Sequence, residues 1–123
     1  MKRLIAAAAA AALVVALAVF CHLQTQKTAA EVAAKTKAII ASAENGTTTG
    51  LEQDFCSYWD KQEPLLSLFM NHGTLQEIGA TATKMAAAAR QQEFFEVSAA
   101  AQEIAYTVQK AYEDEKLHWA ALF

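Results

Sequence analysis

The longest apolar run in the chain lies near its N-terminus. From Leu4 to Leu23 the sequence contains no charged side chain, no proline and no glycine. A helix needs about 20 mostly apolar residues to cross the hydrocarbon core of a bilayer. The large apolar side chains of the run contribute about −0.3 to −0.6 kcal/mol each to insertion, which sums to about −3 to −5 kcal/mol. Residues 4–23 are therefore predicted to form a transmembrane anchor of modest strength.

A cleaved signal peptide is the alternative interpretation of this run. A signal peptide also has a basic tip, but its apolar core spans only about 7–15 residues and ends at a small-residue cleavage site. Ala16 and Ala18 fit such a site, with cleavage after Ala18. The greater length of the run, and a helical pattern that continues to Asn45 without a breaker, favour an uncleaved anchor. Lipid attachment at Cys21 is disfavoured because the bulky Phe20 precedes it.

The charges around the run predict how it is oriented. Lys2 and Arg3 stand immediately before it. Basic residues flanking a transmembrane helix favour the cytoplasmic side. We therefore expect a cytoplasmic tip at residues 1–3 and an extracytoplasmic domain at residues 24–123, on a single-pass protein of the cell membrane.

Beyond the anchor, apolar residues recur at spacings of three and four, the period of a helix buried on one face. No alternating pattern typical of a strand is present. The predicted class is all-α: the transmembrane helix continues into an extracytoplasmic antiparallel bundle, with about four helices in total. The predicted bundle helices are 24–45, 50–71, 74–91 and 93–117.

Local signals predict where these helices begin and end. Gly46 is expected to terminate the first helix, because glycine readily adopts a positive φ. Pro64 is expected to kink or restart the second helix. Thr74 and Glu77 have the spacing of a capping box, which predicts a new helix start at Thr74. Phe69, on the apolar stripe of the second helix, is expected to belong to the core.

The composition excludes several classes of partner. The chain has a net charge of −3, and all its acids follow the anchor. The acidic outer domain argues against a nucleic-acid partner, which requires a basic stripe, and against docking on anionic lipid. The two cysteines, Cys21 and Cys56, do not form the pattern of a disulfide framework or of a zinc ribbon.

Residues 59–72, WDKQEPLLSLFMNH, resemble a family of unknown function. Its members are short, N-terminally anchored helical proteins of Firmicutes, especially clostridia. The resemblance extends over most of the chain, and Asn71 stands where the family has an acid. It implies a helix that starts just after the histidine and two helices that lead to an apolar C-terminus; it implies no activity. The matching positions are Trp59, Ser67, Leu68, Phe69, His72 and Thr74.

His72, Asn71 and Trp59 are the predicted binding residues. A histidine at a helix junction can contact a ligand or respond to pH near neutrality. The alternative is that His72 only binds free backbone carbonyls at a helix end. Glu113–Glu115 supply three consecutive acids, which point in different directions on a helix and lack the loop of a calcium site.

The sequence predicts no catalytic residue, no metal ligand and no cofactor. A zinc site needs three or four ligands, and the three histidines show no H-x-x-x-H pattern. The serines lack the context of a nucleophile elbow. We therefore do not expect an enzyme.

The predicted function is a membrane-anchored, non-enzymatic protein-interaction module of the bacterial cell envelope. Its expected partners are the lipid bilayer, through residues 4–23, and an envelope or membrane protein. The alternative is a sensor-like bundle that binds a small molecule and acts through a membrane partner. Ala8, Ala12 and Ala16 have the small-residue spacing that lets transmembrane helices approach closely, which leaves homo-oligomerisation open.

Overall fold

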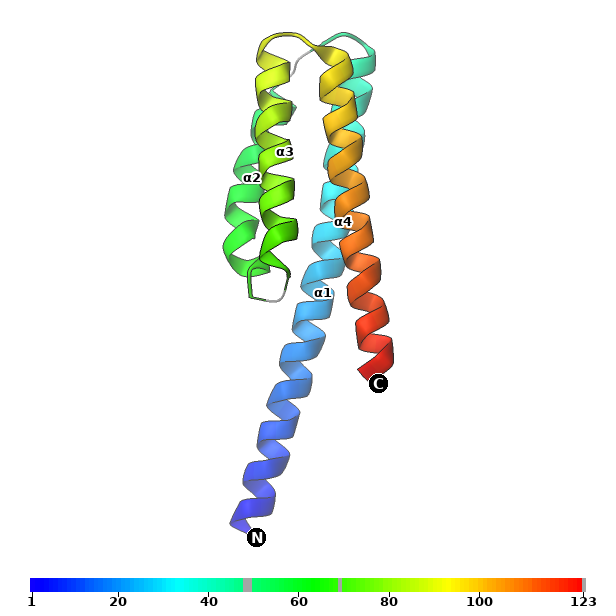
Figure 1. Cartoon of the computed structure of the whole chain (residues 1–123). Helices are drawn as coiled ribbons and strands as arrows, with labels where there is room; N and C mark the ends of the chain where they lie inside the picture. Colours follow the sequence, from blue (N-terminus) through cyan, green and yellow to red (C-terminus); the bar gives the residue numbers. More distant parts are fainter. Residues whose placement is uncertain (48–49, 69, 123) are drawn as a thin grey trace.

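The computed structural model describes residues 1–47, 50–68 and 70–122, apart from the side chains of residues 118, 119 and 122. These residues form four α-helices and contain no strand (Figure 1). The all-helical class and the long apolar first helix are confirmed. The helices are α1 (Lys2–Glu44), α2 (Leu51–Leu66), α3 (His72–Arg90) and α4 (Phe94–Leu122).

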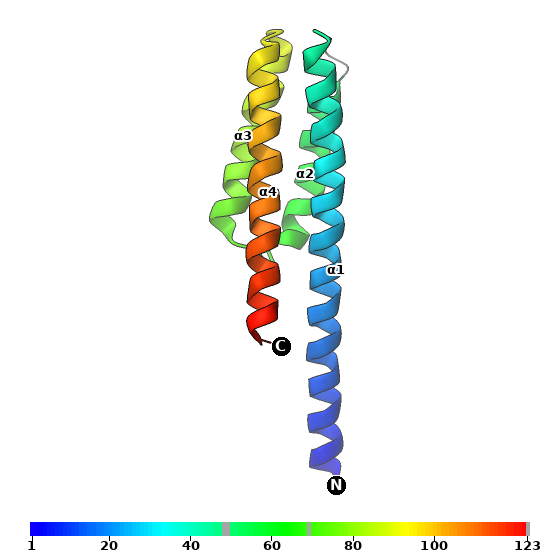
Figure 2. The same ribbon diagram turned by 90° about the vertical axis from the view of Figure 1, so that its right-hand side faces the viewer.

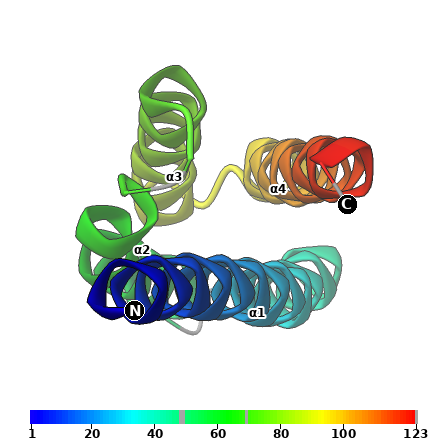
Figure 3. The same cartoon turned by 90° about the horizontal axis from the view of Figure 1, so that it is seen from below.

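The four helices run alternately up and down and occupy the corners of a bundle. Viewed along the bundle axis, each helix packs against two neighbours: α1 and α3 each contact both α2 and α4 (Figure 3). The contact between α1 and α4 is the most extensive, and the two helices lie side by side in both lateral views (Figure 2). The shorter α2 and α3 form a hairpin against this pair.

α1 is one unbroken helix of 43 residues, which corresponds to about 64 Å at 1.5 Å per residue. Its N-terminal half projects beyond the bundle, and the apolar side chains from Leu4 to Leu23 are largely exposed (Figure 1). By length and composition, α1 is the one described helix that is apolar enough to cross a membrane.

The other half of α1 contributes a buried stripe to the core. Ala29, Val32, Thr36, Ile39 and Ala43, which recur at spacings of three and four, are all buried. The Thr36 hydroxyl donates to the Val32 carbonyl at 2.8 Å, so its burial leaves no polar atom unpaired. Facing this stripe are fully buried side chains from the other helices: Phe55, Trp59, Leu66, Leu75, Ile78, Met85, Val97, Ala101 and Ile104.

Two of the predicted helix ends match the structure closely. Gly46 follows the last residues of α1 with a φ of 68°, the left-handed conformation that glycine adopts without a steric penalty. The tight turn expected at residues 91–93 is also present. Gln92 takes a φ of 57° there, and the Glu93 amide donates to the Ala88 carbonyl at 3.0 Å.

The junction between α2 and α3 differs from the prediction. α2 ends at Leu66, and Pro64 lies in its last turn inside one continuous helix, so the helix does not restart there. α3 starts at His72, because Asn71 is extended and its side-chain oxygen accepts from the Gly73 amide at 2.7 Å. Asparagine is among the strongest N-cap residues, so it initiates the helix before Thr74. Phe69 lies outside the described residues.

Gly79 offers a test of the packing between α2 and α3. A Cβ at this position would lie 3.6 Å from the Trp59 indole nitrogen, an ordinary contact. Glycine inside a helix is about 0.8–1.0 kcal/mol less favourable than alanine. Gly79→Ala is therefore expected to raise the free energy of unfolding by up to about 1 kcal/mol, measured by circular dichroism in a denaturant series.

Gly73→Ala provides the matched control. A Cβ there would lie 3.1 Å from the Asn71 side-chain oxygen that caps α3, which crowds the cap. Gly73→Ala should therefore gain less stability than Gly79→Ala, or should lose stability. A clear loss of stability in Gly79→Ala would mean that α3 lies closer to Trp59 than the structure indicates.

Candidate functional site

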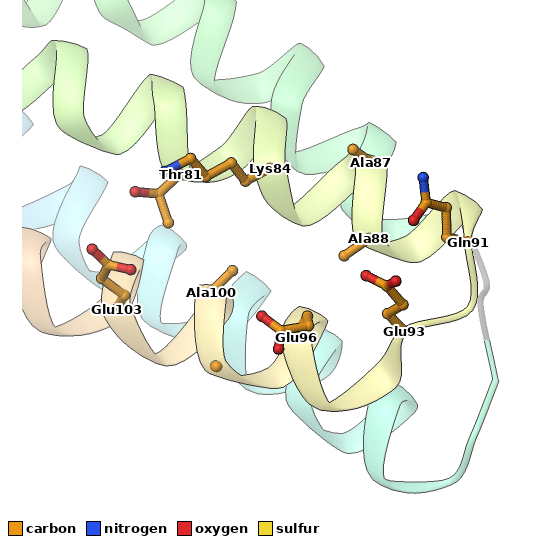
Figure 4. Close-up of a pocket in the computed structure, with 10 residues that line it drawn as sticks. Thr81, Lys84, Ala87, Ala88, Gln91, Glu93, Glu96, Ala100 and Glu103 are labelled. Carbon is orange, nitrogen blue, oxygen red and sulfur yellow. The ribbon is translucent and has the colours of Figure 1, made fainter.

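A groove with a volume of about 450 Å³ lies between α3 and α4, close to the turn that joins them (Figure 4). Its floor is made of small, half-buried side chains, Ala88 from α3 and Ala100 from α4, and the exposed Ala87 and Ala99 also line it (Figure 4). Because alanine fills little space, the two helices leave a hollow where larger side chains would have met.

The polar residues of the groove come from one face of each helix. On α3, Thr81, Lys84, Ala88 and Gln91 recur at spacings of three and four. The groove residues on the α4 side have the same spacing, beginning with Glu93 just before the helix. Residues spaced in this way share a helix face, and the antiparallel arrangement sets the two faces against each other. The members on this side are Glu93, which immediately precedes α4, and Glu96, Ala100 and Glu103 on α4.

The groove carries an excess of negative charge. Glu93, Glu96 and Glu103 are exposed carboxylates, whereas Lys84 is the single basic side chain. Across the described part of the chain, the ion pair that forms within 4.0 Å is Lys27 with Glu31 on α1, so Lys84 does not neutralise these acids by direct contact. Several like charges along one rim attract and steer a partner of opposite charge.

A second hollow, of about 250 Å³, lies between the start of α2 and the end of α3. Glu52 lines it and is only 2% exposed. One of its carboxylate oxygens is fully enclosed without a hydrogen-bond partner. Burying a carboxylate without a partner is unfavourable. Because Glu52 lies in the first turn of α2, the helix dipole offsets part of that free-energy cost. Arg90 is the basic residue that lines the same hollow.

The three predicted binding residues do not share a surface. Trp59 is 1% exposed and stacks on Phe55, with ring centroids 6.5 Å apart. Asn71 and His72 are both exposed at the start of α3, where Asn71 caps the helix. None of the three lines either hollow. Trp59 therefore acts in the core, and the other two lie at the end of the bundle from which the apolar half of α1 projects (Figure 1).

The face of α2 that packs on α1 and α3 contains two groups whose pKa values are raised. Burial, together with the nearby Glu31 carboxylate, raises the pKa of the Tyr58 hydroxyl. The Lys35 ammonium lies 4.7 Å from the centre of the Tyr58 ring. Burial, and to a lesser extent Asp60, raises the pKa of the Cys56 thiol, which donates to the Ala82 carbonyl at 3.3 Å.

These shifts predict a loss of stability in alkali. In the unfolded chain a thiol and a phenol ionise near their ordinary pKa values of 9.0 and 10.0, whereas in the fold they stay protonated to higher pH. The unfolded state is therefore favoured as pH rises above about 9, through the raised pKa values of the folded protein. Chemical denaturation at a series of pH values should show this decline.

Tyr58→Phe isolates the contribution of the phenol. The Tyr58 hydroxyl has no hydrogen-bond partner, so its removal should change little at neutral pH. The alkaline decline above pH 10, near the ordinary value of the phenol, should become shallower in the variant. Identical pH profiles for the two proteins would show that Tyr58 ionises as freely in the fold as in the unfolded chain.

The groove acids could have been found from the sequence, because Glu93, Glu96 and Glu103 share one helix face. The burial of Glu52 has no such signal, since it depends on how α2 meets α3. Comparison with protein-family models, curated proteins and solved structures finds no match to this chain.

Proposed function

We propose that this protein is a membrane-anchored, non-enzymatic interaction module, whose bundle presents the α3–α4 groove to another envelope or membrane protein. The observation that carries the proposal is the continuity of α1. One helix joins an exposed apolar half to a half that is built into the core. A bundle mounted in this way is held at a fixed position relative to the bilayer.

The bundle is proposed to face the outside of the cell, because Lys2 and Arg3 favour a cytoplasmic N-terminus. A periplasmic or surface reporter fused after Phe123 should be active, and a cytoplasmic reporter should not. Mass spectrometry of the purified protein should find Lys2 and Arg3 retained. A mature N-terminus at Val19 would instead indicate a secreted bundle.

The partner is proposed to contribute a basic segment with small or apolar side chains. The acidic rim of the groove favours lysine or arginine, and its alanine floor admits apolar side chains of modest size. Electrostatic complementarity of this kind contributes mainly to association rate and specificity. Burial of the alanine floor would supply the remaining binding energy.

Crosslinking in native membranes tests this interface. Ala88→Leu fills the floor and Glu96→Lys reverses one rim charge. Both should abolish a discrete crosslinked product that the unaltered protein forms. Ala80→Leu and Glu77→Lys are matched controls on exposed positions of α3 outside the groove, and both should keep the product. If the groove variants and the controls crosslink equally well, the partner does not occupy the groove.

The alternative function, a sensor-like bundle that binds a small molecule, is favoured by the hollow at Glu52. An enclosed carboxylate oxygen without a partner can accept a hydrogen bond from a small organic cation. Guanidinium and alkylammonium ions, used as probes, should then raise the melting temperature of the protein and leave that of Glu52→Gln unchanged. A shift of equal size in both proteins would exclude Glu52 as the receptor.

Membership of the clostridial family that residues 59–72 resemble stays a prediction, as does the absence of enzymatic activity. Neither is needed for the interaction proposal, which depends on α1 and on the groove. The interaction proposal would be supported further by neighbouring genes that encode a membrane protein with a basic extracytoplasmic helix.

A further inference from the structure

A ring contact between α1 and α4 shows which residues of the two helices lie beside each other near the C-terminal end of α4. The rings of His22 and Tyr112 lie stacked, with centroids 6.4 Å apart and planes inclined by 24°. The two helices are antiparallel neighbours (Figure 2). Because both rise by 1.5 Å per residue, each step forward along α4 is level with one step back along α1. Leu117 therefore lies level with about Leu17, and the end of α4 at Leu122 with about Ala12.

This alignment places the end of α4 beside the apolar run of α1. Residues 113–116 carry four consecutive charged side chains and lie level with α1 residues 18–21. The next six residues, 117–122, carry no Asp, Glu, Lys or Arg and lie level with residues 12–17, well inside the run from Leu4 to Leu23. The order from charged to uncharged residues is the order in which a helix would enter a membrane from its surface.

The described side chains of this segment, those of Leu117, Ala120 and Ala121, are all exposed. The Leu117 side chain is 69% exposed. An uncharged segment of this length extends about 9 Å along the helix axis.

The turn between α2 and α3 lies at the same end of the bundle (Figure 1). Leu66 and Met70, on either side of this turn, line a small internal cavity together with Thr25 and Tyr112. The turn is therefore level with Thr25, just above the apolar run of α1. Leu68, within it, is 78% exposed. In Figure 1 the turn lies at the end of the bundle from which α1 projects.

We propose that the base of the bundle is a lipid-docking surface: residues 117–122 enter the nearer leaflet beside α1, and Leu68 rests at its headgroup boundary. This inference rests on the proposed anchoring by α1. The bound lipid is zwitterionic, because the three acids of residues 113–115, level with the last residues of the apolar run, would repel anionic headgroups. Two contacts beside the anchor would fix the tilt of the bundle, and with it the direction in which the α3–α4 groove faces.

Depth-dependent fluorescence quenching tests the proposal on the full chain in phosphatidylcholine vesicles. Single cysteines, introduced after Cys21→Ser and Cys56→Ala, carry an environment-sensitive dye at position 14, 68, 95 or 117. Lipids brominated on their acyl chains quench the dye only within the bilayer. Position 14 reports on the anchor itself. Position 95 is the matched control, because Phe95 is 83% exposed near the opposite end of α4. Circular dichroism confirms that each labelled protein is folded.

We expect quenching at position 117 to be several-fold greater than at position 95, with position 68 between them. If the dye is quenched at position 14 but no more at position 117 than at position 95, the lipid-docking surface is overturned and the anchor stands. No quenching at position 14 would overturn both the anchor and the docking surface. Quenching at position 117 that appears only when phosphatidylglycerol is added would show that the lipid class is wrong.

Discussion

Trp59→Ala is expected to abolish cooperative unfolding of the bundle. The Trp59 side chain is almost fully buried, stacks on Phe55 and packs against α3 at Gly79. Truncation of a buried aromatic side chain typically lowers stability by about 3–5 kcal/mol. Small domains have total stabilities from about 5 kcal/mol upward, and a core with several alanines belongs at the low end. Thermal melts of the full chain in mild detergent should lose their cooperative transition.

Two variants separate a core role for Trp59 from a binding role. Trp59→Phe keeps a ring against Phe55 and removes an indole nitrogen that has no hydrogen-bond partner, so it should lose much less stability than Trp59→Ala. His72→Ala removes an exposed side chain and should lose about 1 kcal/mol or less. If Trp59→Ala instead melts like the unaltered protein but no longer crosslinks to its partner, Trp59 is a binding residue, as the sequence motif suggested.

The helices were predictable because their signals are local. The stripe on α1 repeats every three or four residues, and burial of one face follows directly from that period. Gly46 marks the end of α1 through its own conformational freedom. Neither feature depends on which helix becomes the neighbour, so the sequence alone was sufficient for both.

The junction between α2 and α3 was harder because two local signals competed. Asn71 and Thr74 can both cap a helix, and the structure uses Asn71. The C-terminal limit of α4 was placed at residue 117, five residues before the observed end at Leu122. The helix continues through the charged residues 113–116, because charged side chains on an exposed face do not interrupt a helix.

The candidate site was less predictable than the fold, because it depends on which helices meet. The acids at 93, 96 and 103 were visible as one face, but the sequence does not show that the face of Lys84 lies opposite. Trp59 was selected for its motif and proved to be buried. An exposed Trp and a core Trp occupy the same helical spacing, so periodicity does not distinguish them.

Val14→Asp is expected to remove the protein from the membrane. Val14 lies near the middle of the apolar run, and its side chain is exposed outside the bundle. An aspartate at the centre of a transmembrane helix contributes about +2.5 to +3.5 kcal/mol to insertion. The whole run supplies only about −3 to −5 kcal/mol on the same scale, because many of its residues are alanine. The substitution should therefore bring the net insertion energy close to zero.

A change of about 3 kcal/mol corresponds to about a hundredfold change in the insertion equilibrium. After alkaline carbonate extraction, a large fraction of the Val14→Asp protein, about half at a net insertion energy of zero, should thus appear in the supernatant, whereas the unaltered protein stays with the membrane pellet. Ala34→Asp is the matched control, since it places the same charge on an exposed face of α1 beyond the run. This control should sediment with the membranes, because residues 4–23 are unchanged. Retention of Val14→Asp in the pellet would show that the apolar half of α1 is not what holds this protein in the bilayer.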